Sequence, residues 1–338
     1  MKIGIAIEET WAFFHEIYAD LSEHHETSLY EPKIRNTPVL KERLNRYYSR
    51  RDMAAFLRNQ QVVFFEWASR LLAQASHMPK TCGLVTRLHR YEMYHWLDQV
   101  RWEAVDRVIV VSEAKRREFA RRLPDQADKL VVIPEAISLK RFHPHPKPFQ
   151  GNIGILCHLT PRKRVYELIL AFYELSQRRQ QLHLHIGGGE HPRFRDYYQA
   201  LRSLVSDLDL EQRVTFHGNQ EDPTGWYRGI DIFVSNSYSE GLQLSPMEAV
   251  ASGCYCLSHR WEGAEELLPE ENLFYTERDF IRLVEAYLDL SEAEKQQRIC
   301  ALQERVTGQF DMDRTKVRIR ELVESVGADY PPRAGSAG

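Results

Sequence analysis

The sequence lacks any apolar run long enough to cross a membrane, and it has no paired Cys-x-x-Cys motif. Its five cysteines are scattered and odd in number, which argues against a structural zinc or a disulfide framework and favours a reducing compartment. A net charge of only -3 gives no general basic surface for nucleic acid. We therefore expect no binding of nucleic acid. Because the apolar run at residues 3–7 is too short for the core of a signal peptide, we expect a cytoplasmic protein.

The length and the apolar content predict two domains. The chain has 338 residues and a mass of 39.7 kDa, more than a single hydrophobic core usually supports. Hydrophobic residues make up 43% of the sequence, enough for two cores.

Short apolar segments rich in β-branched residues alternate with segments of helical period, as in βα units around a parallel sheet. The apolar segments are residues 3–7, 61–65, 83–88, 108–111 and 130–133, and then 153–156, 182–186, 214–216, 232–235 and 255–258. The pattern predicts an α/β fold with two Rossmann-like doubly wound domains, which we expect to face a cleft.

The expected boundary between the domains lies in a proline-rich stretch. Three prolines in residues 142–148 disfavour both helix and central strand, so this stretch is taken as the linker. The expected parts are an acceptor-binding domain at 1–147, a nucleotide-sugar-binding domain at 148–310, a C-terminal helix at 311–328 that packs back toward the first domain, and a disordered tail at 329–338.

The strongest local signal is the loop and helix start at residues 240–248. Ser245, Pro246 and Glu248 have the spacing of a capping box at a helix N-terminus, and spacing alone favours that role for Glu248. Such a helix end suits a diphosphate. Glu240 lies in a polar loop, where a carboxylate can bind sugar hydroxyls or face positive charge at an anomeric carbon, although a loop glutamate is more often only solvated.

Glu240 and Glu248, with seven residues between them, resemble the E-x7-E signature of retaining GT-B glycosyltransferases of family 4, the glycosyl transferases group 1. Other segments agree in order and spacing. Residues 159–163 resemble the family's phosphate-binding turn, residues 187–190 its glycine-rich loop and residues 216–219 its base-binding strand, while residues 108–112, 132–134 and 141–144 resemble the end of its first domain. The likeness covers nearly the whole chain and is strongest in the second half.

The resemblance implies a role for each site residue. Glu240 would be catalytic beside a donor-sugar hydroxyl, Glu248 would bind the ribose, and Lys163 would neutralise the diphosphate without a metal; a solvated basic turn is the alternative for residues 162–164. The full donor-binding set is His158, Arg162, Lys163, Gly188, Asn219, Gly241, Leu242, Leu244 and Glu248. No metal ligand and no cofactor are expected, and a nucleotide-diphosphate sugar is the donor substrate.

Two positions depart from the family pattern. His158 stands where relatives have an arginine, and it carries positive charge only part of the time near neutral pH. The first loop contains Glu8 and Glu9 where many relatives are glycine-rich, so its contacts cannot be transferred. Two carboxylates there would repel a diphosphate unless they point toward the acceptor.

In the first half, His89 follows the strand at 83–88 and corresponds to a histidine that relatives place near the donor sugar. A catalytic role and a structural role are equally open for it. Trp67, after Glu66, can stack on a sugar, but a packed core tryptophan is the commoner case. The basic, aromatic segment at residues 41–51 can make weak peripheral contact with an anionic membrane, although a solvated helix face is the commoner explanation.

The resemblance therefore predicts a metal-independent retaining transfer of a sugar from a UDP- or GDP-linked donor to an acceptor hydroxyl. The acceptor would be a glycan, a lipid or a small molecule, in polysaccharide, glycolipid or glycoconjugate synthesis. The alternatives are a catalytically lapsed nucleotide-sugar-binding or interaction protein of the same fold, and a GT-B enzyme of sugar-nucleotide epimerisation or phosphorolysis.

Overall fold

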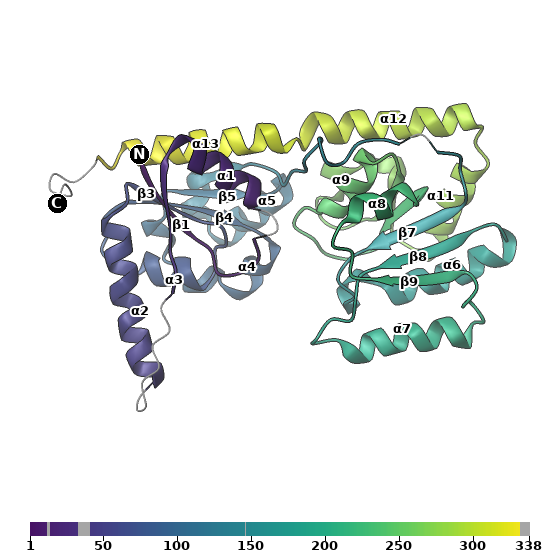
Figure 1. The fold of residues 1–338 in the computed structure, drawn as a ribbon, viewed down its shortest axis with the longest axis horizontal. Coiled ribbons are helices and arrows are strands. Elements are labelled where there is room, and N and C mark those ends of the chain that lie inside the picture. The colour runs from purple at the N-terminus through teal and green to yellow at the C-terminus, as the bar shows by residue number, and fades with distance from the viewer. Residues whose placement is uncertain (12–13, 33–40, 146, 332–338) are drawn as a thin grey trace. The chain divides into compact units, whose positions relative to one another are not determined.

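The computed structural model describes residues 1–11, 14–32, 41–145 and 147–331. The chain divides into two compact units (Figure 1). The first unit consists of Met1–Pro134 with Asp313–Gly338, and the second is Glu135–Met312. Each unit is built around one parallel six-stranded sheet, which confirms the expectation of two doubly wound α/β units.

The sheet of the first unit has the strand order β2-β1-β3-β4-β5-β6. Its strands are β1 (Lys2–Ala6), β2 (Glu26–Leu29), β3 (Val62–Phe65), β4 (Gly83–Leu88), β5 (Arg107–Val110) and β6 (Leu130–Val132). Both faces of this sheet are covered, and all four residues of β3 are buried valine or phenylalanine, as expected for a central parallel strand. The sequence did not signal β2, because this short edge strand is polar and largely exposed.

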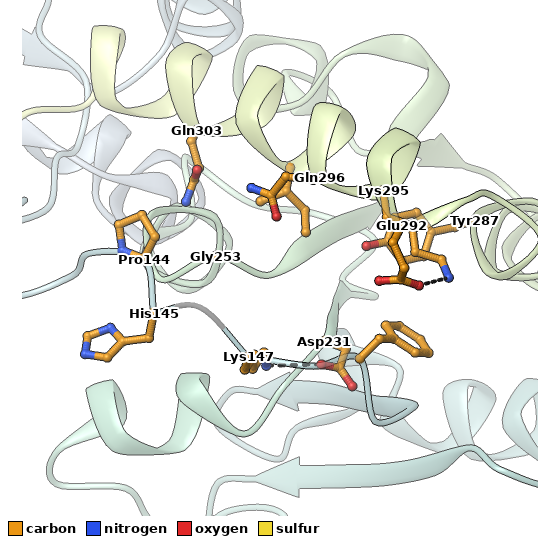
Figure 2. Close-up of a pocket in the computed structure, with 12 residues that line it drawn as sticks. Pro144, His145, Lys147, Asp231, Gly253, Tyr287, Glu292, Lys295, Gln296 and Gln303 are labelled. Atoms are coloured by element: carbon orange, nitrogen blue, oxygen red, sulfur yellow. Dashed lines mark hydrogen bonds and ion pairs between the residues drawn. The ribbon is translucent and has the colours of Figure 1, made fainter.

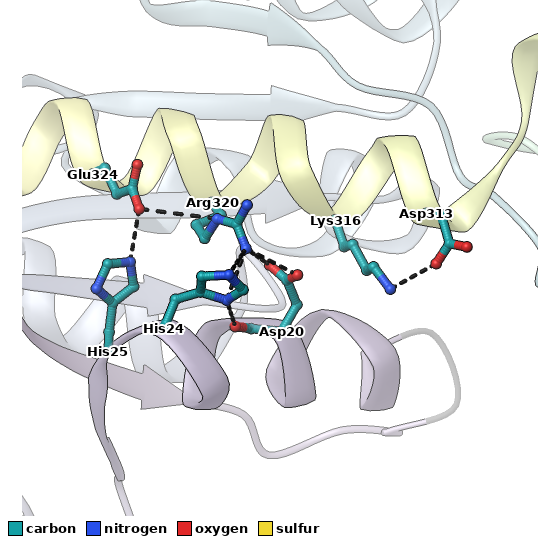
Figure 3. Close-up of polar contacts among 7 residues, drawn as sticks. All are labelled: Asp20, His24, His25, Asp313, Lys316, Arg320 and Glu324. Carbon is teal, nitrogen blue, oxygen red and sulfur yellow. Dashed lines mark hydrogen bonds and ion pairs between the residues drawn. The ribbon is translucent and has the colours of Figure 1, made fainter.

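Among the described residues, six α-helices belong to the first unit. They are α1 (His15–His24), α2 (Lys41–Arg58), α3 (Arg70–Ser76), α4 (Arg90–His95), α5 (Glu113–Arg122) and α13 (Met312–Ala328). The last helix reaches this unit from the far end of the sequence, and polar contacts fix it against α1 (Figure 3). Arg320 Nη1 lies 3.0 Å from both carboxylate oxygens of Asp20, and His25 Nε2 lies 2.8 Å from Glu324 Oε1.

The start of the expected disordered tail, at residues 329–331, is placed in the structure. Tyr330 donates a hydrogen bond from its hydroxyl to Asp106 Oδ1 (3.1 Å), and its carbonyl accepts one from Gln61 Nε2 (3.2 Å). These contacts attach the chain to the first unit through Tyr330. Residues 332–338 lie outside the described residues.

The sheet of the second unit has the order β12-β11-β10-β7-β8-β9. Its strands are β7 (Asn152–Leu156), β8 (His183–Gly187), β9 (Val214–Gly218), β10 (Ile232–Ser235), β11 (Tyr255–His259) and β12 (Leu273–Phe274). Counted within the unit, this is the 3-2-1-4-5-6 order of a dinucleotide-binding Rossmann sheet, with its switch point between β7 and β10. The register there pairs Ile153 with Ile232.

Helices cover both faces of this second sheet. They are α6 (Val165–Arg178), α7 (Arg195–Asp207), α8 (Pro223–Arg228), α9 (Leu244–Ala251), α10 (Ala264–Leu267), α11 (Glu277–Leu288) and α12 (Glu292–Gln309). α6 contacts α7 and α11 on one face, and α9 contacts α8 and α12 on the other. α6 buries Val165, Leu168, Ile169, Phe172 and Leu175, the i, i+3, i+4, i+7 spacing of an amphipathic helix.

The proline-rich stretch is not a linker between the units. The first unit ends at Pro134, and residues 135–147 belong to the second unit. Phe142 is buried there against Tyr227, and Lys147 forms an ion pair with Asp231 (3.2 Å). Prolines therefore mark an extended segment that packs on the second core, where buried side chains outweigh the breaker signal on which the expected boundary depended.

Candidate functional site

Two loops meet at the switch point of the second sheet. One runs from the end of β7 through a short 3₁₀ helix, η4 (Pro161–Lys163), to α6, and the other runs from the end of β10 to α9. Because ligands of open α/β sheets bind outside the carboxyl ends of the strands at such a point, this is where a ligand of the second unit is expected.

A carboxylate and two cations meet between these loops. Lys163 Nζ lies 2.7 Å from Glu240 Oε1, and the guanidinium of Arg162 forms an ion pair with the same oxygen. Glu240 is buried, while the side chains of Lys163 and Arg162 remain 12% and 29% exposed. The two residues singled out from sequence as sugar and diphosphate contacts therefore lie close enough to reach one shared ligand.

Electrostatics keep the Glu240 carboxylate ionised. Burial alone would raise its pKa, but the charges of Lys163 and Arg162, with hydrogen bonds from Lys163 and Ser237, outweigh burial and lower the pKa below its ordinary value. The site therefore holds a negative charge beside two positive ones at neutral pH.

Hydrogen bonds to backbone carbonyls, two of them from side chains, fix the two loops to each other. Arg162 donates from Nη1 to the Ser239 carbonyl (2.7 Å), and its own carbonyl accepts from the Tyr238 N–H (3.3 Å). Asn236 Nδ2 donates to the carbonyl of Arg164, whose backbone is left-handed (φ 51°). η4 is thus held in place before the N-terminus of α6, an end that carries partial positive charge.

The glycine-rich loop after β8 lies next to the β7 loop. Gly188 has φ +122°, and a Cβ atom there would lie 1.9 Å from the Cys157 carbonyl oxygen, so only glycine fits. Asn219 Oδ1 accepts a hydrogen bond from the Gly189 N–H (2.8 Å). The predicted contacts Gly188 and Asn219 therefore belong to one structured loop pair.

His158 lies at the end of β7, close to the cations. Desolvation lowers its pKa first, and the charges of Lys163, His191 and Arg162 lower it further. The imidazole is therefore neutral near pH 7, so His158 adds no positive charge to the site.

The spacing of Glu248 suggested that it closes a capping box, but the structure shows that it does not. α9 begins at Leu244, two residues earlier than the box requires, and its N-cap is Gln243 instead of Ser245. Glu248 Oε2 instead accepts a hydrogen bond from the Tyr227 hydroxyl (2.8 Å). Burial raises the pKa of Glu248, an effect that Tyr227 and Arg141 only partly offset.

The remaining predicted donor contacts are Gly241, Leu242 and Leu244, which lead from Glu240 into α9. Gly241 is buried, and the two leucines pack half-buried against the hydrophobic core of the second unit. They carry the chain from the carboxylate to the helix.

Gln243 is a site residue that the sequence analysis missed. Its buried amide donates from Nε2 to Glu240 Oε1 (3.0 Å) and accepts from the Ser235 hydroxyl at the end of β10. A glutamine inside a loop motif carries no signal of its own. The one hint in the sequence is that Gln243 follows Glu240 by three residues, close enough for their side chains to meet.

The first unit has a different ion pair at the carboxyl ends of β3 and β4. Arg87 donates from Nε to both oxygens of Glu66 (3.1 and 3.2 Å), and both side chains are 0% exposed. His89 Nε2 lies 3.3 Å from Glu66 Oε1, and its ring lies 4.3 Å from that of Trp67. His89 also forms a capping box with Glu92 at the start of α4, so its ring is firmly oriented within this unit.

In the first loop of this unit, the charge of Glu8 is paired with that of Arg70. Glu8 Oε2 accepts a hydrogen bond from Arg70 Nε (2.8 Å), and the two side chains form an ion pair. This pairing offsets the charge of Glu8 and reduces the repulsion expected from two adjacent carboxylates.

A pocket of about 410 Å³ lies at the opposite end of the second sheet (Figure 2). Phe149, Asp231 and Gly253, which line it, precede β7, β10 and β11, so the pocket lies at the amino ends of these strands. None of the predicted donor contacts lines it. It is therefore separate from the loops that carry Lys163 and Glu240.

Part of the second unit is similar to known proteins. Residues 150–293 match the family Glycosyl transferases group 1. The chain is 26% identical over 152 residues to mannosylfructose-phosphate synthase of Agrobacterium fabrum, covering 43% of this chain and 34% of that protein. It is 27% identical over 166 residues to a D-inositol 3-phosphate glycosyltransferase of Kineococcus radiotolerans, covering 44% and 38%. The chain thus spans little more than a third of the length of these curated relatives.

Solved structures resemble the chain over nearly its whole length. The Anabaena protein HepE in complex with UDP-glucose has a TM-score of 0.78 at 17% identity, covering 96% of this chain and all 100% of that one. Sucrose-phosphate synthase of Thermosynechococcus elongatus has a TM-score of 0.75 at 16% identity, covering 97% and 99%. At this identity the likeness concerns the fold.

Fold and site together define a GT-B architecture, with a switch-point site in its second unit. Within that fold, residues 150–293 are similar to the glycosyl transferases group 1.

In the described part of the chain, none of the helices has the length and apolar character needed to cross a membrane. Among those same residues, no three His, Cys, Asp or Glu side chains gather in a way that could hold a metal ion. Metal independence itself stays a prediction.

Proposed function

We propose that the chain is a metal-independent retaining glycosyltransferase that takes its sugar from a nucleotide-diphosphate donor and passes it to an acceptor hydroxyl. The observation that carries the proposal is the 2.7 Å contact between Lys163 and Glu240 at the switch point of the second sheet. The glycosyl transferases group 1 match over the same unit supports it. A UDP-linked donor is favoured over a GDP-linked one because HepE, of similar fold, is described in complex with UDP-glucose.

In this proposal, Lys163 and Arg162 stabilise the departing diphosphate. Negative charge grows on the bridging oxygen as its bond to the anomeric carbon breaks, and fixed cations beside a helix N-terminus stabilise that charge without reorganising. The half-buried positions of both cations strengthen this effect, since water screens them less than it screens surface charges.

The ionised Glu240 faces the sugar. A carboxylate of lowered pKa can bind a sugar hydroxyl and offset the positive charge that develops at the anomeric carbon. The acceptor hydroxyl then attacks from the face that the diphosphate leaves, which retains the anomeric configuration.

The other predicted contacts surround the nucleotide. We assign Glu248 to the ribose hydroxyls. Gly188, Asn219, Gly241, Leu242 and Leu244 form the loops around the donor, and His158 is a neutral hydrogen-bonding partner for phosphate.

The acceptor, a glycan, lipid or small molecule, is assigned to the first unit, with His89 oriented beside it. The exposed Tyr47 and Arg50 of α2 support weak peripheral contact with an anionic membrane from the cytoplasmic side. Side chains 41–44 and 46 of that segment lie outside the described residues.

A panel of UDP- and GDP-sugars tests the proposal directly. Incubation with purified protein and candidate acceptors should release the nucleotide diphosphate, and NMR of the product should show the donor's anomeric configuration. Tight nucleotide binding without turnover would instead identify a lapsed binding protein. Conversion of the donor sugar without nucleotide release would identify an epimerase, and an inverted product would refute retention.

A further inference from the structure

Three donors converge on one oxygen of Glu240. Lys163 Nζ (2.7 Å), the Arg162 guanidinium and Gln243 Nε2 (3.0 Å) all contact Oε1. Two of these donors are charged and are the groups that a donor diphosphate needs under the proposed function. The carboxylate and a diphosphate therefore have the same two partners.

Gln243 differs from the two cations in charge and in burial. Its side chain is only 7% exposed, and it is held at both ends of its amide. Its Oε1 accepts from Ser235, and its Nε2 also lies 3.4 Å from the Ser237 hydroxyl. It also occupies the N-cap position of α9. A neutral, fixed amide attracts a diphosphate far less than an ammonium or guanidinium does, so Gln243 keeps its contact with Glu240.

We propose that Glu240 competes with the donor diphosphate for Lys163 and Arg162, and that Gln243 is the positioning residue that keeps the carboxylate in place once the diphosphate binds both cations. This inference rests on the proposed function of the site. Diphosphate binding is then coupled to the release of Glu240 from its ion pairs, which frees the carboxylate for the sugar while Gln243 fixes its direction.

The competition predicts that removing the carboxylate charge strengthens nucleotide binding, where a loss would ordinarily be expected. Glu240→Gln removes the competing charge, so nucleotide diphosphate should bind more tightly even as turnover falls. A site in which Glu240 only supports the loop, or only binds the nucleotide, predicts weaker binding for the same variant. The sign of the change therefore separates the two accounts.

The experiment is calorimetric titration of UDP and GDP into the full-length wild type, Glu240→Gln, Gln243→Asn and the double variant. We expect roughly threefold to tenfold tighter binding for Glu240→Gln, the range for removing one partner of a partly exposed ion pair. Gln243→Asn shortens the amide so that it no longer reaches Glu240 but keeps a residue favoured at an N-cap. Gln243→Asn alone should weaken the binding of UDP and GDP about twofold to threefold. Added to Glu240→Gln, it should have no further effect, because its action passes through the carboxylate.

Turnover gives the second measurement. Gln243→Asn should lower kcat about tenfold with a much smaller change in KM, since it misdirects the carboxylate after the donor has bound. Gln303→Asn, the same change at the amino end of the sheet, is the matched control and should change neither constant. Gln243→Met, which keeps length and apolar bulk, repeats the test if the asparagine variant does not fold, as judged by thermal unfolding.

Unchanged or weaker nucleotide binding in Glu240→Gln overturns the competition, and equal effects of Gln243→Asn with and without Glu240 overturn the positioning role. If the wild type binds neither UDP nor GDP and releases neither from any sugar nucleotide, the proposed function itself fails. That result is distinct from failure of the inference alone.

Discussion

The two units place a carboxylate and an arginine at the carboxyl ends of their sheets in opposite ways. In the first unit, Glu66 and Arg87 are both 0% exposed and form an ion pair, and His89 also contacts Glu66. In the second, Glu240 is buried, but its partners Lys163 and Arg162 remain partly open to solvent. The sealed pair can only hold its unit together and orient His89, while the open cluster can exchange a partner for a ligand. The same chemistry therefore serves structure in one unit and, under the proposed function, binding in the other.

The largest effect should come from breaking the sealed pair. Arg87→Met leaves the Glu66 carboxylate buried without its cation and should lower the free energy of unfolding by about 3 to 5 kcal/mol. Denaturant titration measures the loss. Arg116→Met, which breaks the exposed pair with Glu113 (48% and 46% exposed), is the control and should cost less than about 1 kcal/mol. Similar losses in both variants would remove the distinction between sealed and open pairs.

Breaking the open cluster should affect catalysis far more than stability. Lys163→Ala should lower kcat/KM for a sugar nucleotide about 100-fold to 1,000-fold, the effect of losing one group that stabilises transition-state charge. Its unfolding free energy should change by no more than about 1 kcal/mol, because Arg162 still pairs with Glu240. Arg179→Ala, at the other end of α6, should leave kcat/KM unchanged. If Lys163→Ala unfolds the protein as strongly as Arg87→Met does, the comparison is wrong.

The open site also depends on close backbone approach. Gly188→Ala should destabilise the second unit by roughly 2 to 3 kcal/mol, because its φ of +122° is strained for alanine and its Cβ would clash with the Cys157 carbonyl. Gly225→Ala, where a Cβ meets nothing within 4 Å in α8, should instead be neutral or stabilise by about 0.5 kcal/mol. Thermal unfolding of both variants compares them, and equal shifts in Tm would contradict the account.

The smallest effect is a difference in pH dependence within the second unit. The folded-state pKa of Glu240 is lowered, so its contribution to stability is present above about 4.5 and is lost as pH falls through the folded pKa. The folded-state pKa of Glu248 is raised, so its contribution is present below about 4.5 and is lost as pH rises through the folded pKa. Stability curves of wild type against Glu240→Gln and Glu248→Gln should therefore diverge with opposite slopes, and parallel slopes would refute this assignment.

The open site was easier to predict from sequence than the sealed one. Parallel strands buried on both faces give continuous apolar runs, so the strands at 62–65, 83–88 and 232–235 were found nearly to the residue. Lys163 and Glu240 follow such strands, and the family resemblance supplied their roles. Arg87, in contrast, lies within β4, and its partner Glu66 lies 21 positions away in the sequence. No local sequence pattern therefore predicts their pairing.

Other features depend on tertiary contacts that a local pattern does not contain. α9 begins two residues earlier than the predicted capping box requires, and Gln243 at its N-cap bonds to Ser235 and Glu240. The proline-rich stretch joined the second unit because Phe142 and Lys147 found buried partners there. In the proline-rich stretch, packing between distant segments overrode the local preference, whereas at α9 short-range hydrogen bonds accompany the different helix start.

A crystal structure of the protein with UDP or GDP tests the central claim most directly. The account predicts the diphosphate at the carboxyl ends of β7 and β10, with a phosphate oxygen about 3 Å from Lys163 Nζ and Glu240 turned from that cation onto Gln243. A nucleotide bound in the pocket at the amino ends of these strands, or anywhere out of reach of Lys163, would contradict it.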